Sequence, residues 1–224
     1  MGVHTSWGGF LDPFISGFHD FFGFPNGNRD AFPEGEYEFL LLESRRRLRL
    51  EVASHSPGLE DLRLFAKRRL GRSEDGSSAT SARATVRLAS GTFAGSTGRA
   101  DAAVSLLHRR SWGRTHLHLQ GGVTTVNAPE VLEAASRDVA GFVSATGEIG
   151  IVPSLSFLAQ FVGGTAYVDG FGTTTLDRGP MNLVLGFAGS AGSAWRWSFS
   201  FAEDVPPNSP SADFTVGVEA SRTF

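Results

Sequence analysis

The main pattern in this sequence is a strict alternation of apolar and polar positions, which is clearest towards the C-terminus. In residues 194–203 aromatic side chains alternate with small, hydroxylic or charged ones, and after a loop rich in Pro, Asn and Ser the alternation returns in residues 212–224. Because successive side chains of a β-strand point to opposite faces, each segment is expected to form a strand with one apolar and one polar face. The apolar positions are Trp195, Trp197, Phe199, Phe201, Phe214, Val216, Val218 and the terminal Phe224.

The same alternation continues upstream and predicts ten strands, or eleven if the first segment is a hairpin that bends near residues 44–46. Each predicted strand is close to the roughly 9–11 residues that a tilted strand needs to cross a bilayer. The predicted strands are residues 37–53, 59–70, 82–90, 100–111, 115–126, 138–148, 153–167, 180–189, 194–203 and 212–224.

The lengths of the connections support a barrel more strongly than any single strand does. Read back from the C-terminus, they alternate between long and short: 204–211, 190–193, 168–179, 149–152, 127–137 and 112–114. Transmembrane β-barrels join their strands by short turns on one side and longer loops on the other, whereas a β-sandwich has no reason to do so. The exception is the connection 71–81, which should be short and is long. The pattern predicts an all-β fold, an antiparallel transmembrane β-barrel of about 10–12 strands.

The N-terminal part differs from the rest, because its Phe residues fall at helical spacing. Four of them lie four residues apart and would form one stripe of a short amphipathic helix, with Asp12, Ser16, His19 and Asp20 on the other side. The stripe consists of Phe10, Phe14, Phe18 and Phe22. Such a helix could lie at a membrane interface or plug a barrel mouth, or its stripe could pack on the barrel's own loops. We therefore expect a single domain over residues 1–224, with helix and loop in 1–36 and barrel strands in 37–224.

Composition agrees with a barrel and excludes other classes. The chain has 224 residues, 41% of them hydrophobic, and no run of about 18 apolar residues that would form a transmembrane helix. In a barrel only every second strand residue faces lipid, so the overall hydrophobic content is expected to be ordinary. The absence of Cys excludes a disulfide scaffold and a thiol-ligated metal.

The net charge of −3 conceals a strongly uneven distribution. Residues 1–44 carry a net −6, residues 45–114 carry +9, and residues 115–224 carry −6. Charged side chains facing lipid cost roughly 2–4 kcal/mol at the bilayer midplane, so the basic block should face the lumen and make it prefer anions. The alternative is that these residues pair with acids of the flanking parts or of absent strands. The candidate basic sector of the lumen is Arg63, Lys67, Arg69, Arg83 and Arg87.

Candidate catalytic or metal-binding groups have simpler interpretations. His116 and His118 share one strand face and could bind a metal or act as a base, but the alternation already explains them as polar residues in a wet lumen, which we favour. Glu203 and Asp204 are adjacent on a strand, so they point to opposite faces. We therefore predict no enzyme activity, no metal and no cofactor. Nucleic-acid binding is not expected, because the chain is acidic and its basic residues are not interleaved with exposed aromatics.

Two resemblances add to this interpretation. The terminal strand ends on an aromatic residue and so resembles the terminal strand of bacterial outer-membrane barrels. In those proteins the barrel assembly machinery recognises this strand. The chain as a whole resembles an uncharacterised family of bacterial barrels, domain of unknown function 3187. The segments that carry this resemblance are GGFLD at 8–12, FHD at 18–20, GFP at 23–25, GLEDLRL at 58–64 and FAED at 201–204 followed by SP at 209–210. Glu60 and Arg222 depart from the family pattern.

The resemblance implies an outer-membrane protein with a signal peptide and further N-terminal strands, and it implies no activity. The first residues contain neither a basic nor an apolar signal region, so we expect that this chain is truncated at its N-terminus. Its partners would be outer-membrane lipid and the barrel assembly machinery. The favoured function is a small pore or transport-related barrel whose solute the sequence does not identify. The alternatives are a structural or adhesive barrel that transports nothing, and a soluble β-sandwich or ligand-binding barrel.

Overall fold

The computed structural model describes the chain in ten segments, which belong to two compact units. The described residues are 3–4, 12–23, 38–43, 48–53, 58–59, 61–91, 98–128, 130–170, 177–205 and 214–222. One unit comprises residues 1–63, 87–100 and 127–134, and the other comprises residues 64–86, 101–126 and 135–224.

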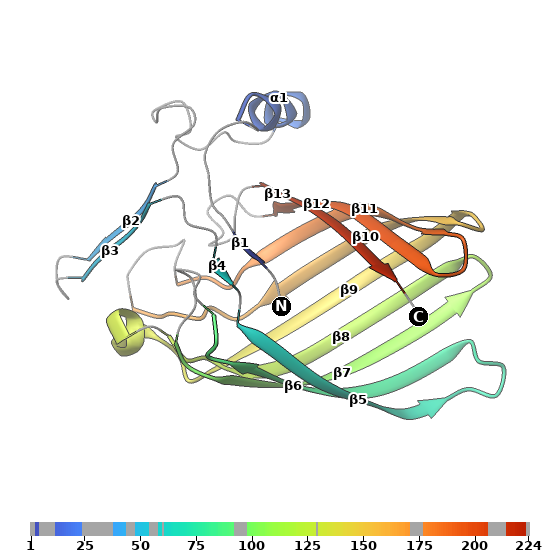
Figure 1. Ribbon diagram of the computed structural model, residues 1–224, viewed down its shortest axis with the longest axis horizontal. Coiled ribbons are helices and arrows are strands. Elements are labelled where there is room, and N and C mark those ends of the chain that lie inside the picture. Colours follow the sequence, from blue (N-terminus) through green and yellow to red (C-terminus); the bar gives the residue numbers. More distant parts are fainter. Residues whose placement is uncertain are drawn as a thin grey trace. The chain divides into compact units, whose positions relative to one another are not determined.

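The second unit contains most of a nine-stranded antiparallel sheet, in which the strands follow one another in chain order and to which the first unit contributes residues 62–63 and 87–88 (Figure 1). The two edges are β5 and β13, and the sheet is not closed by pairing between them in the described part of the chain. Its strands are β5 (Leu62–Arg72), β6 (Ser78–Leu88), β7 (Asp101–Trp112), β8 (Thr115–Thr125), β9 (Val139–Val152), β10 (Leu155–Gly164), β11 (Met181–Ala191), β12 (Trp195–Asp204) and β13 (Phe214–Arg222). The prediction of an all-β antiparallel fold is confirmed at this level.

Short turns join the strands at one end of the sheet and longer connections join them at the other (Figure 1). The short turns are residues 73–77, 113–114, 153–154 and 192–194, and the six-residue 3-10 helix η2 (Glu130–Ala135) lies in one of the longer connections. The expected alternation of short and long connections is therefore present across the whole sheet.

The connection after β5 corrects the sequence-based boundaries. It was expected to be long, over 71–81, but β5 and β6 extend into it and leave only residues 73–77 as a turn. The Asp75 carboxylate accepts hydrogen bonds from the Ser73 hydroxyl at 2.6 Å and from the Ser77 backbone N–H at 3.0 Å. Gly76 adopts a φ of 69°, which a residue with a side chain rarely adopts. These contacts hold the hairpin closed where the sequence pattern indicated a loop.

The register gives the sheet one apolar and one polar face. Phe157 of β10 lies opposite Phe187 of β11, with their ring centroids 5.5 Å apart, and Phe187 lies opposite Phe199 of β12. Phe199 in turn lies opposite Val218 of β13. Residues at alternate positions of the same strands form the polar face, so the alternation in the sequence becomes two chemically distinct surfaces.

No second layer packs on the apolar face in the described part of the chain. The buried hydrophobic residues there are Ala135, Ala140 and Ala166, all of them small. Large side chains on the apolar face remain open to the surroundings, with exposed fractions of 58% for Leu106 and 54% for Val143. The described sheet therefore has no hydrophobic core of the kind that stabilises a water-soluble β-sandwich.

The first unit contains short elements. The strands β1 (Val3–His4) and β4 (Gly58–Leu59) pair antiparallel, and so do β2 (Glu38–Glu43) and β3 (Leu48–Ala53). The pairing of β2 with β3 confirms the hairpin alternative for residues 37–53. Within the described residues, no helix combines the length and the apolar character that spanning a membrane requires.

The predicted Phe-rich helix is present as α1 (Asp12–Phe22), but its burial differs from the expectation. His19, which was placed on the polar side, is 1% exposed, whereas Phe14 and Phe21 are 57% and 81% exposed. Phe14 and Phe18 stack with their ring centroids 6.5 Å apart, as their spacing of four residues predicts. The helix therefore buries a histidine and exposes part of its aromatic surface.

Candidate functional site

A cavity of about 760 Å³ lies on the polar face of the sheet, within the second unit. Residues of β5, β6, β7, β8, β9 and β10 line it, so it spans six of the nine strands of the sheet. Its polar lining includes Lys67, Arg69, Arg109, Gln120, Ser144 and Gln160. Its volume falls within the range of roughly 300–1,000 Å³ that is common for small-molecule sites.

The register aligns one row of polar residues across this cavity. Arg109 of β7 lies opposite His118 of β8, His118 opposite Thr146 of β9, and Thr146 opposite Gln160 of β10. Gln160 Nε2 donates a hydrogen bond to Thr146 Oγ1 at 2.9 Å. In the neighbouring row, Gln120 of β8 lies opposite Ser144 of β9.

The cavity is cationic on the side of β5 and β7. Lys67, Arg69, Arg72 and Arg109 line it, and no carboxylate is among the lining residues. In the described part of the chain, no acidic side chain lies within ion-pair distance of Lys67, Arg69 or Arg109. The positive charge on this side is therefore available to an anion.

Glu148 lies beside this row and is already engaged with one of its members. Its Oε2 lies 3.3 Å from His118 Nε2, and the ring of His116 lies 6.4 Å from that of His118. His116 and His118 share the polar face, as predicted. No group of three or more potential ligands in the described segments is arranged to hold a metal ion. The pair His118–Glu148 is a hydrogen-bonded part of the polar face.

The cavity contains only part of the predicted basic sector. Lys67 and Arg69 line it, whereas Arg83 lies on β6 outside its lining, and Arg63 and Arg87 belong to the first unit. The sequence interpretation missed Arg72 and Arg109. Alternation alone could not have identified Arg109, because residues 108–110 read His-Arg-Arg and offer a basic side chain to both faces of β7.

Two Arg–Trp pairs occupy the apolar face at the end of the sheet with the short turns. The Arg110 guanidinium lies 5.5 Å from the ring centroid of Trp112, next to the turn 113–114. The Arg222 guanidinium lies 5.8 Å from that of Trp195, its register partner just after the turn 192–194. A guanidinium over an indole face is a favourable cation–π contact. This contact accounts for Arg222, a position that would otherwise suit an apolar residue.

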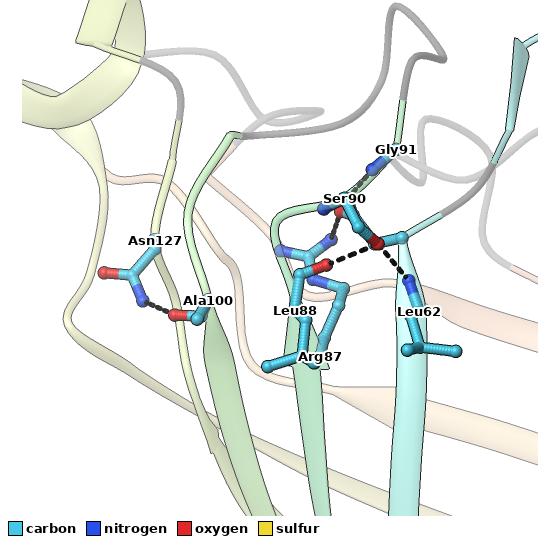
Figure 2. A network of polar contacts seen from close by, with 8 residues as sticks. Leu62, Arg87, Leu88, Ser90, Gly91, Ala100 and Asn127 are labelled. Carbon is cyan, nitrogen blue, oxygen red and sulfur yellow. Dashed lines mark hydrogen bonds and ion pairs between the residues drawn. The ribbon is translucent and has the colours of Figure 1, made fainter.

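A polar junction in the first unit connects the start of β5 to the end of β6 (Figure 2). The Asp61 carboxylate accepts hydrogen bonds from the backbone N–H groups of Ser90 at 3.1 Å and Gly91 at 2.8 Å, and lies 3.8 Å from the Arg87 guanidinium. The Leu62 N–H donates to the Ser90 hydroxyl at 2.9 Å. Asp61 is 6% exposed, so its charge is stabilised by these partners rather than by water.

Comparison with known families assigns the chain. The sequence profile of a family described as "Protein of unknown function (DUF3187)" matches residues 1–221, which is nearly the whole chain. The chain belongs to the DUF3187 family. No curated protein matches it at a significant level.

The DUF3187 segments noted in the sequence occupy several parts of this fold. Phe18, His19 and Asp20 lie on α1, Asp61 forms the junction at the start of β5, and Glu203, 8% exposed, lies near the end of β12. Phe10, Phe224 and residues 209–210 lie outside the described residues, as does the side chain of Phe214. Among the described family-like residues, Asp61 has a clear structural role, because its carboxylate holds the junction together.

Proposed function

We propose that this DUF3187 chain forms a β-barrel in the bacterial outer membrane, in which the apolar face contacts lipid and the polar face lines a water-filled lumen. The observation that carries the proposal is the uncovered apolar face, which has large exposed side chains and no core beneath it in the described residues. In water such a surface would demand a second layer or a partner, whereas in a bilayer lipid covers it.

Three further features support a bilayer. The strands of the sheet have 9 to 14 residues, which suits a tilted crossing. Short turns and long connections alternate, as in outer-membrane barrels. Trp112 and Trp195 lie at the end with the short turns, where outer-membrane barrels carry an aromatic girdle. Arg110 and Arg222 stack on these rings, from where their charges can reach lipid headgroups.

The proposed location implies two partners. Outer-membrane lipid would contact the face that contains Leu106, Val143 and Trp197. The barrel assembly machinery would engage β13, which is an edge of the described sheet with an apolar side that includes Val216 and Val218. An open edge strand offers unpaired backbone groups for such an engagement.

We propose that the barrel is a small pore with a preference for anions. Lys67, Arg69 and Arg109 lie on the proposed lumen face without an acidic neighbour in the described part, so their field would attract anions and repel cations. The aqueous path would run along the polar face past Gln120 and Ser144.

Planar-bilayer recording of the refolded chain tests this function. Under a KCl gradient, the reversal potential should indicate preference for chloride. Replacing Lys67, Arg69 and Arg109 together by Gln should remove most of that preference, because the unpaired charges are lost. The control is Arg68→Gln, which removes one positive charge from the opposite face of β5 and should leave selectivity unchanged; Arg69→Gln alone, which also removes one charge, should lower it.

Other outcomes contradict the proposal in different ways. Cation selectivity would refute the preference for anions but would still support a pore. Insertion without conductance would favour a structural or adhesive barrel. A chain that stays monomeric and soluble without detergent would refute the membrane assignment altogether.

A further inference from the structure

We infer that the cavity on the polar face binds a hydroxylated organic anion, that is, a solute that combines a carboxylate or phosphate group with several hydroxyls. Sugar acids and sugar phosphates have this chemistry. The inference rests on the proposed function, because the polar face must line a solute path for such a molecule to reach the cavity. It goes beyond a general preference for anions by naming what is recognised.

The anionic group is assigned to the side of the cavity formed by β5 and β7. Lys67 and Arg69 project from β5 and Arg109 from β7, with β6 between them. Strands two apart are separated by roughly 10 Å, which long basic side chains can bridge around one ligand. Guanidinium groups bind carboxylates and phosphates through paired hydrogen bonds, and these three cations have no acidic partner among the described residues.

The hydroxyl groups are assigned to the side formed by β8, β9 and β10. The lining there includes the amides and hydroxyls of Gln120, Ser144, Thr146 and Gln160, beside His118 and Leu119. Amide and hydroxyl groups can both donate and accept, as sugar hydroxyls do. Gln160 uses one N–H on Thr146, and this contact fixes both side chains.

The distribution of charge in the cavity selects against other ligands. The absence of a lining carboxylate disfavours amines and metal cations. An inorganic anion would use the cationic side and leave the neutral side without a partner, whereas an uncharged sugar would leave the lining cations without a counter-charge. A molecule with both kinds of group uses the whole lining of this cavity of about 760 Å³.

Isothermal titration of the full chain, refolded in detergent micelles at low salt, tests the inference. The probes are galacturonate, glucose 6-phosphate, galactose and inorganic phosphate. We expect the first two to bind at least roughly tenfold more tightly than the last two, since each of the latter lacks one half of the contacts. Comparison of galacturonate with glucose 6-phosphate then shows whether the site takes a carboxylate or a phosphate.

Variants assign the two halves of the cavity. Arg109→Gln and, independently, Arg69→Gln should weaken both hydroxylated anions about tenfold or more, which is the effect of losing one charge-assisted hydrogen bond. Gln160→Ala should weaken both hydroxylated anions but not inorganic phosphate. Arg68→Gln, on the opposite face of β5, should change none of these affinities. Far-UV circular dichroism confirms that each variant is folded.

Several results would overturn the inference. Equal affinity for inorganic phosphate and glucose 6-phosphate would reduce the site to a simple anion patch. Equal losses in Arg68→Gln and Arg109→Gln would show that only total charge matters. Failure of all four probes to bind a chain that inserts and conducts would refute the ligand site and leave the pore. Specific binding by a chain that never inserts would refute the pore and keep the ligand site. The two proposals can therefore fail independently.

Discussion

At the scale of single residues, polar side chains outside the cavity stabilise turns and junctions between strands. Asp61 shows this best, because its carboxylate joins the start of β5 to backbone N–H groups beyond the end of β6. Gly91 completes the junction: a Cβ added there would lie 2.7 Å from the Leu59 carbonyl oxygen and 2.8 Å from the Asp61 nitrogen. These are backbone atoms, which cannot rotate away as a side chain can. The sequence marks residues 58–64 as a family-like segment, but it does not show that Asp61 binds the backbone beyond β6.

Replacing Gly91 by Ala should therefore destabilise the chain. The added methyl group forces the backbone of Leu59 and Asp61 to move, at a cost of about 1–3 kcal/mol that is typical of overpacking. The matched control is Gly71→Ala in β5, where an added Cβ meets nothing within 4 Å and the change should stay within about 0.5 kcal/mol. Urea unfolding of both variants in detergent measures the difference, and equal stabilities would contradict the close packing at Gly91.

The turn at Asp75 gives a prediction about pH. Hydrogen bonds from the Ser73 hydroxyl and from the N–H and hydroxyl of Ser77 stabilise the charged carboxylate and lower the pKa of Asp75 from 3.8 to about 2. Because the folded pKa is depressed, this stabilisation is complete above the ordinary pKa of 3.8 and is lost as the pH falls through about 2. Ser73→Ala removes the strongest contributor and should raise the pKa towards 3.8. Carboxyl NMR titration measures it, and a wild-type midpoint near 3.8 would exclude these contacts in solution.

At the scale of elements, alternation predicts where strands lie and which face each side chain takes. The paired aromatic and aliphatic positions of β10 to β13 follow directly from it. It fails at strand ends, where local hydrogen bonds decide the limits, as in the turn 73–77. It also fails where consecutive residues are all of a basic type, as around Arg109, and it cannot assign burial on a short helix, as His19 shows.

Introducing an arginine should have different effects on stability at two neighbouring positions of β8, because their side chains lie on opposite faces of the sheet. Leu119, 42% exposed on the apolar face near the middle of β8, would hold a charge against lipid in Leu119→Arg, at a cost of roughly 2–4 kcal/mol. Gln120→Arg places the same charge on the polar face and should be tolerated. Equilibrium unfolding in lipid vesicles measures both, and equal costs would argue against a lipid-facing apolar side.

At the scale of the whole molecule, the sequence predicts an antiparallel all-β protein and the structure confirms it, with nine strands in chain order in the described part. Closure into a barrel depends on pairing of the edges β5 and β13 or on further strands between them. Alternation is a local property and carries no information about such closure. The cavity likewise could not be derived from the sequence, because it depends on the register of six neighbouring strands.

The central claim is that the apolar face of the sheet lies against lipid. Because the natural chain contains no Cys, single Cys substitutions along residues 142–149 of β9 can carry spin labels without background labelling. In vesicles, collisions with oxygen, which concentrates in the bilayer, and with a water-soluble nickel chelate should alternate in opposite phase. Positions 143, 145, 147 and 149 should favour oxygen, and the even positions should favour the chelate. Odd positions that are shielded from both reagents, or open to the chelate, would show a protein-covered or water-exposed face and would contradict the account.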